Sequence, residues 1–171
     1  GEATKVDIGM LDCQLALLEN AVMRYQVSGT APGPLGARHP SITPFQAYKT
    51  KDGYIIISAG NDGLFAKLAE ALENPGWAED PDYSSNDNRN KHVEKLKIEM
   101  ESVLTTHTTS HWIEVLDKFG VPSGPINDIG QAATHPQTIA RNMIVSVDDP
   151  ITGPMKVAGN PIKISGFEDP E

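Results

Sequence analysis

The sequence predicts an α+β fold, in which a small domain combines an antiparallel hairpin or sheet with several helices. Two β-rich runs, at residues 45–50 and 54–59, are joined by an Asp-Gly turn, which is a strong short-range signal of a hairpin. Amphipathic helical stretches follow at residues 63–72, 91–104 and 111–119. A hairpin followed by a run of helices, in a chain of 171 residues, is typical of an α+β domain.

A long apolar helix is expected before this domain, over residues 6–27. Two neighbouring apolar stripes run along it, one from Ile8 to Tyr25 and the other from Met10 to Ala21. A helix on a protein surface normally carries only one such stripe. We therefore expect other structure to cover this helix, and we expect two copies of the chain to form a homodimer through residues 6–27 where nothing else covers them.

The remaining elements follow from turn and capping residues. Residues 29–44 contain four prolines and three glycines, so we expect a linker or an extended functional loop there. Asn61 is expected to cap the helix at 63–72, and Gly120 to end the helix at 111–119. Beyond Gly120 we expect an extended stretch at residues 121–128, followed by short helices at 129–134 and after 136. Two short strands are then expected, at 143–147 and 154–158.

These elements divide the chain into four parts. The apolar helix occupies residues 1–28, the linker residues 29–44, the small α+β domain residues 45–135, and a return segment with short strands residues 136–171. Within the small domain, residues 77–90 are polar and rich in turn-forming residues, so no regular element is predicted there.

Composition excludes several classes of protein. The net charge of −9 argues against nucleic-acid or anionic-membrane partners, because both need a positive face. No apolar run approaches the roughly 20 residues that span a bilayer. Cys13 is the one cysteine, so no internal disulfide can form, and the first residues lack the pattern of a secretory signal. We therefore expect a cytoplasmic protein.

Arg38 and His39 are the ligand-binding candidates that the residues alone suggest. Arginine offers a planar fork that binds a carboxylate or a phosphate, and histidine offers a donor that depends on pH. The prolines around them hold the chain stiffly, so little entropy is lost on binding. The alternative is a surface linker that carries these charges incidentally.

Other reactive residue types have structural explanations. His107 and His111 are four residues apart, but no Glu follows the first histidine as it does in zinc proteases, so we expect solvated histidines at a helix start and no metal site. Asp7 is expected to cap the first helix and Asp12 to lie on its polar edge. Cys13 is expected to be a buried, unreactive thiol. The residues therefore assign no catalytic group.

Three stretches resemble a known family. They are Val6–Asp12, then His39–Tyr48 together with Asp52-Gly53-Tyr54, and Gly120–Asn127. In order along nearly the whole chain, they resemble class III CoA-transferases, the family of formyl-CoA transferase and carnitine CoA-transferase. The sequence of residues 39–54 is most similar to the sequences of members that pass CoA between dicarboxylates such as succinate and glutarate.

The resemblance implies a specific architecture and reaction. Class III enzymes are longer, with a large doubly wound α/β domain built from both ends of the chain and a small α+β domain from the middle. Two subunits interlock like linked rings. An aspartate attacks the acyl-CoA thioester, forms anhydride and aspartyl-CoA intermediates, and hands CoA to an acceptor acid. CoA is then a co-substrate, and no covalently bound cofactor is implied.

The resemblance also implies roles within this chain. The helix at 6–27 would belong to the large domain, and the family's nucleophilic aspartate would precede the stretch that begins at Val6. We therefore expect a partial form, inactive alone, with no catalytic residue of its own. Because the small domain closes over the active site, the resemblance implies that Arg38 and His39 bind a CoA phosphate or the acceptor carboxylate, and that Ser58 and Asn61 contact the substrate.

Two alternatives remain open. In the first alternative, the chain is a non-catalytic module that forms homodimers or binds a partner through the apolar helix. In the other it belongs to the acyl-CoA racemase branch of the same family, which moves a proton with acid–base residues. A cleft beside Arg38 and His39 would favour the enzyme interpretation over the module.

Overall fold

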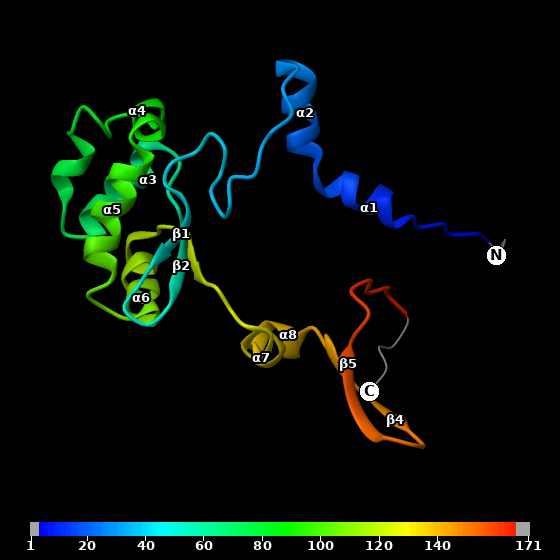
Figure 1. Ribbon diagram of the computed structural model, residues 1–171. Coiled ribbons are helices and arrows are strands. Elements are labelled where there is room, and N and C mark those ends of the chain that lie inside the picture. The colour runs from blue at the N-terminus through cyan, green and yellow to red at the C-terminus, as the bar shows by residue number, and fades with distance from the viewer. Residues whose placement is uncertain (1–3, 167–171) are drawn as a thin grey trace. The chain divides into compact units, whose positions relative to one another are not determined.

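The computed structural model describes residues 4–166 (Figure 1). The chain forms two compact units, Gly1–Pro40 and Ser41–Glu171. Within the described residues, no helix is both long and apolar enough to cross a membrane.

Two short helices form the first unit, where a single long apolar helix is predicted. α1 spans Met10–Leu17 and α2 spans Glu19–Ser28. The helix is interrupted at Leu18, whose N–H bonds to the carbonyl oxygen of Leu15, three residues back, at 3.0 Å. No residue of either helix is buried. Because most helix stability comes from packing, nothing in this unit holds one continuous helix together, and the prediction of a long helix is wrong here.

Two side chains of this unit also differ from expectation. The N-cap of α1 is Gly9, without a side-chain cap, whereas Asp7 lies outside the helix with its carboxylate 3.9 Å from Lys5 Nζ. The predicted cap by Asp7 is therefore wrong, because the helix begins two residues too late for it. Cys13 is exposed rather than buried, since no other element covers α1 in this unit.

A three-stranded antiparallel sheet is the centre of the second unit. Its strands are β1 (Phe45–Lys49), β2 (Tyr54–Ser58) and β3 (Ser123–Pro125), in the order β1-β2-β3. The Asp-Gly hairpin is confirmed, with Tyr48 opposite Ile55. The stretch predicted as extended at 121–128 supplies the third strand, in which Ser123 pairs with Ile57.

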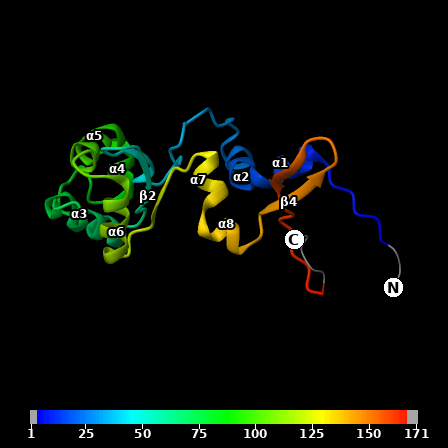
Figure 2. The same ribbon diagram turned by 90° about the horizontal axis from the view of Figure 1, so that it is seen from below.

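Three helices lie on one face of this sheet: α3 (Asp62–Ala71), α5 (Val93–Leu104) and α6 (Thr109–Phe119). Figures 1 and 2 show them on the same side of β2. The fully buried core lies between this face and the helices, and includes Tyr48, Ile55, Ile57, Phe65, Leu68, Leu72, Leu96, Met100, Leu104 and Leu116. Buried positions alternate along β1 and β2, as expected for strands that turn one face toward the core.

Capping residues set the helix ends. Asn61 Oδ1 accepts a hydrogen bond from the Leu64 N–H at 2.8 Å and begins α3, as predicted. Gly120 ends α6 in a left-handed conformation with φ of 67°, which is also as predicted. The stretch at 77–90 is more regular than expected, because it contains the end of η1 (Pro75–Ala78) and most of α4 (Asn86–Lys91).

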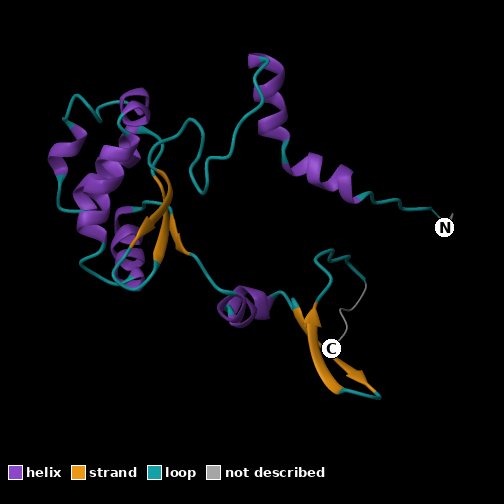
Figure 3. Cartoon of the chain, viewed as in Figure 1, coloured by secondary structure: helices purple, strands orange, loops and turns teal. Residues whose placement is uncertain are grey.

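The chain that follows β3 forms helical structure and then a hairpin (Figure 3). The helices are α7 (Ile129–Thr134) and α8 (Pro136–Ala140), and the strands are β4 (Ile144–Asp149) and β5 (Gly153–Ala158). A capping box begins α7. The helices predicted at 129–134 and after 136 and the strands predicted at 143–147 and 154–158 are thus present.

Candidate functional site

Arg38 and His39 end the first unit. Both are half-buried, and the Arg38 N–H donates to the Leu35 carbonyl oxygen at 3.4 Å, which bends the chain into a turn. Ser58 and Asn61 belong to the second unit. The ligand-binding role of Arg38 and His39 stays a prediction.

Ser58 and Asn61 lie at the end of the hairpin and the start of α3. The Ser58 N–H donates to the Pro122 carbonyl oxygen at 2.9 Å, which extends the pairing of β2 with the chain before β3. Asn61 uses its side-chain oxygen to cap α3. The cap fixes the orientation of the Asn61 amide, whose oxygen keeps a second lone pair and whose nitrogen carries two donors.

Residues 41–44, which end the linker, are anchored by two asparagines of α4. Asn86 and Asn90 donate from Nδ2 to the Ser41 carbonyl oxygen at 2.9 and 2.8 Å. The Thr43 N–H donates to Asn86 Oδ1 at 3.1 Å, and Thr43 Oγ1 donates to Asn90 Oδ1 at 2.6 Å. Because residues four apart share a helix face, both amides reach the same short segment.

Arg89 lies between these two asparagines in the sequence and is completely buried. Its Nε donates to the Thr43 carbonyl oxygen at 2.7 Å, and its Nη1 to the Tyr83 carbonyl oxygen at 2.8 Å. Its Nη2 bonds Asp62 Oδ1 at 2.8 Å and the Gly60 carbonyl oxygen at 3.5 Å. We call Asn86, Arg89 and Asn90 together the α4 clamp.

Two further contacts surround the Arg89 guanidinium. Asp62 supplies the opposite charge, and Arg89 Cζ lies 4.5 Å from the centroid of the Phe65 ring, in cation–π contact. Tyr83 binds the clamp through its carbonyl oxygen, while its hydroxyl donates to Glu99 at 2.9 Å. Burial is the main cause that raises the pKa of Tyr83 to about 12, and the hydrogen bond to Glu99 is the second cause. The hydroxyl therefore stays protonated at neutral pH.

The clamp brings two segments side by side. Residues 41–44 and 59–62 both bind Arg89, and the Ala59 N–H donates directly to the Pro44 carbonyl oxygen at 2.9 Å. The first segment directly follows Arg38-His39-Pro40, and the second contains Asn61 and follows Ser58. Sequence reasoning did not find the clamp. Its signal is the pattern Asn-x-x-Arg-Asn at 86–90, which puts three polar side chains on adjacent turns of one short helix.

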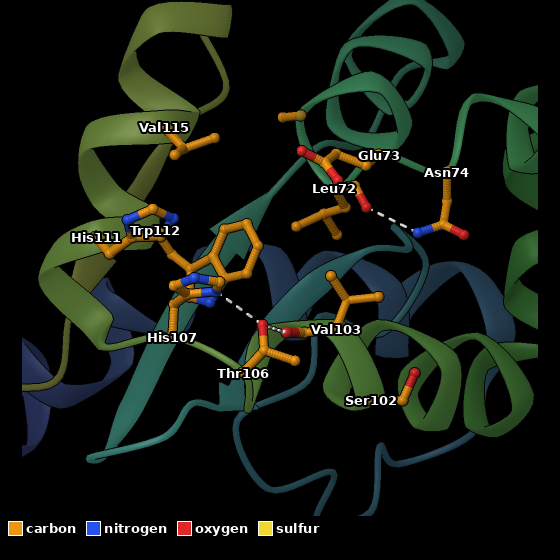
Figure 4. A pocket seen from close by; sticks show the side chains of 11 residues that line it. Leu72, Glu73, Asn74, Ser102, Val103, Thr106, His107, His111, Trp112 and Val115 are labelled. Carbon is orange, nitrogen blue, oxygen red and sulfur yellow. Dashed lines mark hydrogen bonds between the residues drawn. The ribbon is translucent and has the colours of Figure 1, made fainter.

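A hollow with a volume of about 560 Å³ lies among α3, α5 and α6 (Figure 4). His107 and His111 stack in its wall with ring centroids 4.3 Å apart, and the edge of Trp112 meets both rings. Trp112 is nearly buried and donates from Nε1 to the Leu104 carbonyl oxygen at 2.7 Å. Within residues 4–166, no three His, Cys, Asp or Glu side chains are grouped so that they could hold a metal ion.

The hairpin turn is joined to α6 by Asp52. Its Oδ1 accepts from the Thr109 N–H at 2.8 Å and from Thr109 Oγ1 at 3.0 Å. These bonds hold the pKa of Asp52 below its ordinary value, and the bond from the Thr109 N–H has the largest effect. A carboxylate at a helix N-terminus is favoured by the helix dipole, so Asp52 has a structural role.

Comparison with known proteins shows the family. The profile of CoA-transferase family III matches residues 1–170. The acetyl-CoA:oxalate CoA-transferase of Acetobacter aceti is 38% identical over 170 residues, which are 99% of this chain and 42% of the relative. The human succinyl-CoA:glutarate CoA-transferase is 30% identical over 168 residues, or 98% of this chain and 38% of the relative.

A solved structure agrees with this match. The crystal structure of a CAIB/BAIF family protein from Brucella suis superposes with a TM-score of 0.77 at 33% identity, covering 96% of this chain and 42% of that one. The chain therefore belongs to CoA-transferase family III, whose members act on acyl-CoA and carboxylic acids. It spans about two fifths of the length of the curated relatives described above.

Proposed function

We propose that these residues serve as the acceptor-binding part of a family III CoA-transferase, which moves CoA from an acyl-CoA to a carboxylic acid. The observation that carries the proposal is the match of the family profile along residues 1–170. The activity is proposed for a protein of the relatives' length, and none is expected of the 171 residues alone. Asp7 and Asp12 are both exposed, and neither is assigned as the nucleophile.

A dicarboxylic acid is the proposed acceptor. The names of the two relatives described above include oxalate and glutarate, both of which are dicarboxylates. The Arg38 guanidinium suits one carboxylate of such an acid, or a CoA phosphate, because its fork donates two parallel hydrogen bonds. His39, Ser58 and Asn61 would supply further polar contacts.

The same proposal includes a homodimer. α1, α2 and the Leu18 between them expose Leu11, Leu15, Leu18 and Val22, the most exposed of which is Leu11 at 71%. Apolar side chains in such number along one pair of helices are typical of a surface that another chain covers. This observation also fits the alternative of a non-catalytic module. The relatives described above carry transferase names, which favours the transferase over the racemase branch.

A chimaera tests the transferase proposal. The matching region of the Acetobacter aceti enzyme is replaced by these 171 residues, and CoA transfer from acetyl-CoA to oxalate is measured. We expect transfer, and we expect Arg38→Ala to raise the KM for the acceptor about tenfold or more, because a charge-assisted pair is lost. Arg141→Ala, at an exposed arginine, is the matched control and should leave kcat and the KM for the acceptor unchanged. A folded chimaera without transfer would contradict the proposal and favour the module.

A further inference from the structure

We propose that Arg89 is a positioning residue for the acceptor site, since it fixes the chain that leads out of Arg38-His39 against the chain that follows Ser58. This inference rests on the proposed function. It concerns a residue that would touch neither CoA nor the acceptor. Four hydrogen bonds of one buried guanidinium carry it.

Burying the charged side chain of Arg89 is energetically unfavourable if the residue only fills space in the core. It is 0% exposed, whereas its one carboxylate partner, Asp62, has a side chain that is 67% exposed. Removing a guanidinium from water is strongly unfavourable, and an apolar side chain of similar volume is often as stabilising as a buried ion pair. A charged side chain at this place therefore points to a role in fixing geometry.

The bonds of Arg89 go mainly to backbone. Three carbonyl oxygens accept from it, and they come from three separate places in the chain, at Thr43, Gly60 and Tyr83. A guanidinium is planar and its donors have fixed directions. Carbonyls that bind the same fork are therefore held at fixed positions relative to one another.

Two of these carbonyls are near predicted site residues in the sequence. Thr43 lies four residues after His39, and Gly60 lies between Ser58 and Asn61. Asn86 and Asn90 hold Ser41 and Thr43 in the same place through four more hydrogen bonds. The clamp thus sets where the linker leaves the α+β body beside the end of the hairpin.

This arrangement has a kinetic consequence. A guanidinium binds a carboxylate through two parallel hydrogen bonds only when its fork is correctly placed, and a misplaced fork forms fewer of them. When the clamp loosens, the acceptor should bind more weakly while the donor and the covalent steps are little changed. The KM for the acceptor should therefore rise much more than kcat falls.

The test compares Arg89→Lys with the unsubstituted protein of family length that carries these residues. Lysine keeps the charge but not the fork. We expect hydrogen exchange over residues 40–45 and 57–62 to become at least about tenfold faster, and the KM for the acceptor to rise about tenfold, with kcat within about twofold. Arg141→Lys, the same substitution at an exposed position, should change neither.

Asn90→Ala is the second variant, and it decides the question if Arg89→Lys does not fold. It removes two bonds to residues 41–43 and leaves Arg89 in place. Faster exchange with an unchanged KM for the acceptor, in either folded variant, would show a purely structural clamp and overturn the inference. Unchanged exchange in a folded Arg89→Lys would overturn it as well. An unsubstituted protein that transfers no CoA would overturn the proposed function, and the exchange data would still decide whether Arg89 holds the two segments.

Discussion

Gly60 and Ile42 pack so closely that a methyl group placed on the Gly60 α-carbon would overlap Cγ2 of Ile42. This contact lies beside the α4 clamp and joins the same two segments, 41–44 and 59–62. Hydrogen bonds of Arg89 and the fit of Ile42 against glycine therefore act on one junction. Glycine is required here by space rather than by backbone conformation.

Gly60→Ala should destabilise the protein by about 1–3 kcal/mol, because the added methyl overpacks the junction. Urea unfolding measures the loss. Gly76→Ala, where nothing lies within 4 Å of the new methyl, is the control and should have little effect. In an Ile42→Ala background, the cost of Gly60→Ala should largely disappear, since the overlapping atom is gone. An equal cost in both backgrounds would show that the two residues do not interact in this way.

Leu15→Asp should disperse the homodimer expected through residues 6–27. Leu15 is 51% exposed in the single chain, and a second copy would bury the new carboxylate without a partner, which costs several kcal/mol. Sedimentation velocity at micromolar concentration measures the change. Ile98→Asp, at a side chain of α5 that is 69% exposed, is the control and should leave the dimer intact. A folded, strictly monomeric unsubstituted chain would end this idea.

Asp52→Asn should make stability depend less on acidic pH. Hydrogen bonds from Thr109 lower the pKa of Asp52, so the folded state favours the charged carboxylate. That stabilisation is complete above the ordinary pKa of about 3.9, and it is lost as the pH falls through the lower pKa of the folded state. The variant should therefore be less stable at pH 7, and the difference in urea midpoint should shrink below about pH 4. A constant difference across this range would contradict the role given to Asp52.

Glu73→Gly should stabilise the end of α3 by about 0.5–1 kcal/mol. Glu73 has φ of 58°, a left-handed conformation that glycine adopts freely. The N–H groups of Glu73 and Asn74 bond back to Glu70 and Ala69, the usual pattern at a left-handed helix end. Thermal unfolding measures the gain. Glu70→Gly, inside the same helix, should lower stability by about 1 kcal/mol, and a loss at both positions would contradict the argument.

Sequence reasoning worked best where a local signal decides the structure. The Asp-Gly turn at 52–53 fixes the hairpin, and Asn61 and Gly120 mark helix ends, because these effects act between neighbouring residues. β3 escaped assignment to the sheet because a strand of three residues, Ser123–Pro125, is too short to show alternation. The break at Leu18 was missed because neither proline nor glycine marks it.

The site was only partly accessible from the sequence. Arg38, His39, Ser58 and Asn61 come from a charged loop and from a family resemblance, and the family itself is confirmed. Arg89 escaped notice because its partners are backbone carbonyls 6 to 46 residues away, and no spacing rule reports such contacts. Exposure of Cys13 was likewise not visible, because it depends on which other elements cover the helix.

The distance in sequence between Thr43 and Arg89 also orders events on the ribosome. Thr43 is synthesised 46 residues before the side chain that holds it. At roughly 5–20 residues per second, that interval lasts about 2–9 s. Both strands of the hairpin are complete at Ser58, before Arg89 is made. A nascent chain paused between these two residues would therefore hold both hairpin strands but none of the hydrogen bonds by which α4 fixes residues 41–44 in the folded protein.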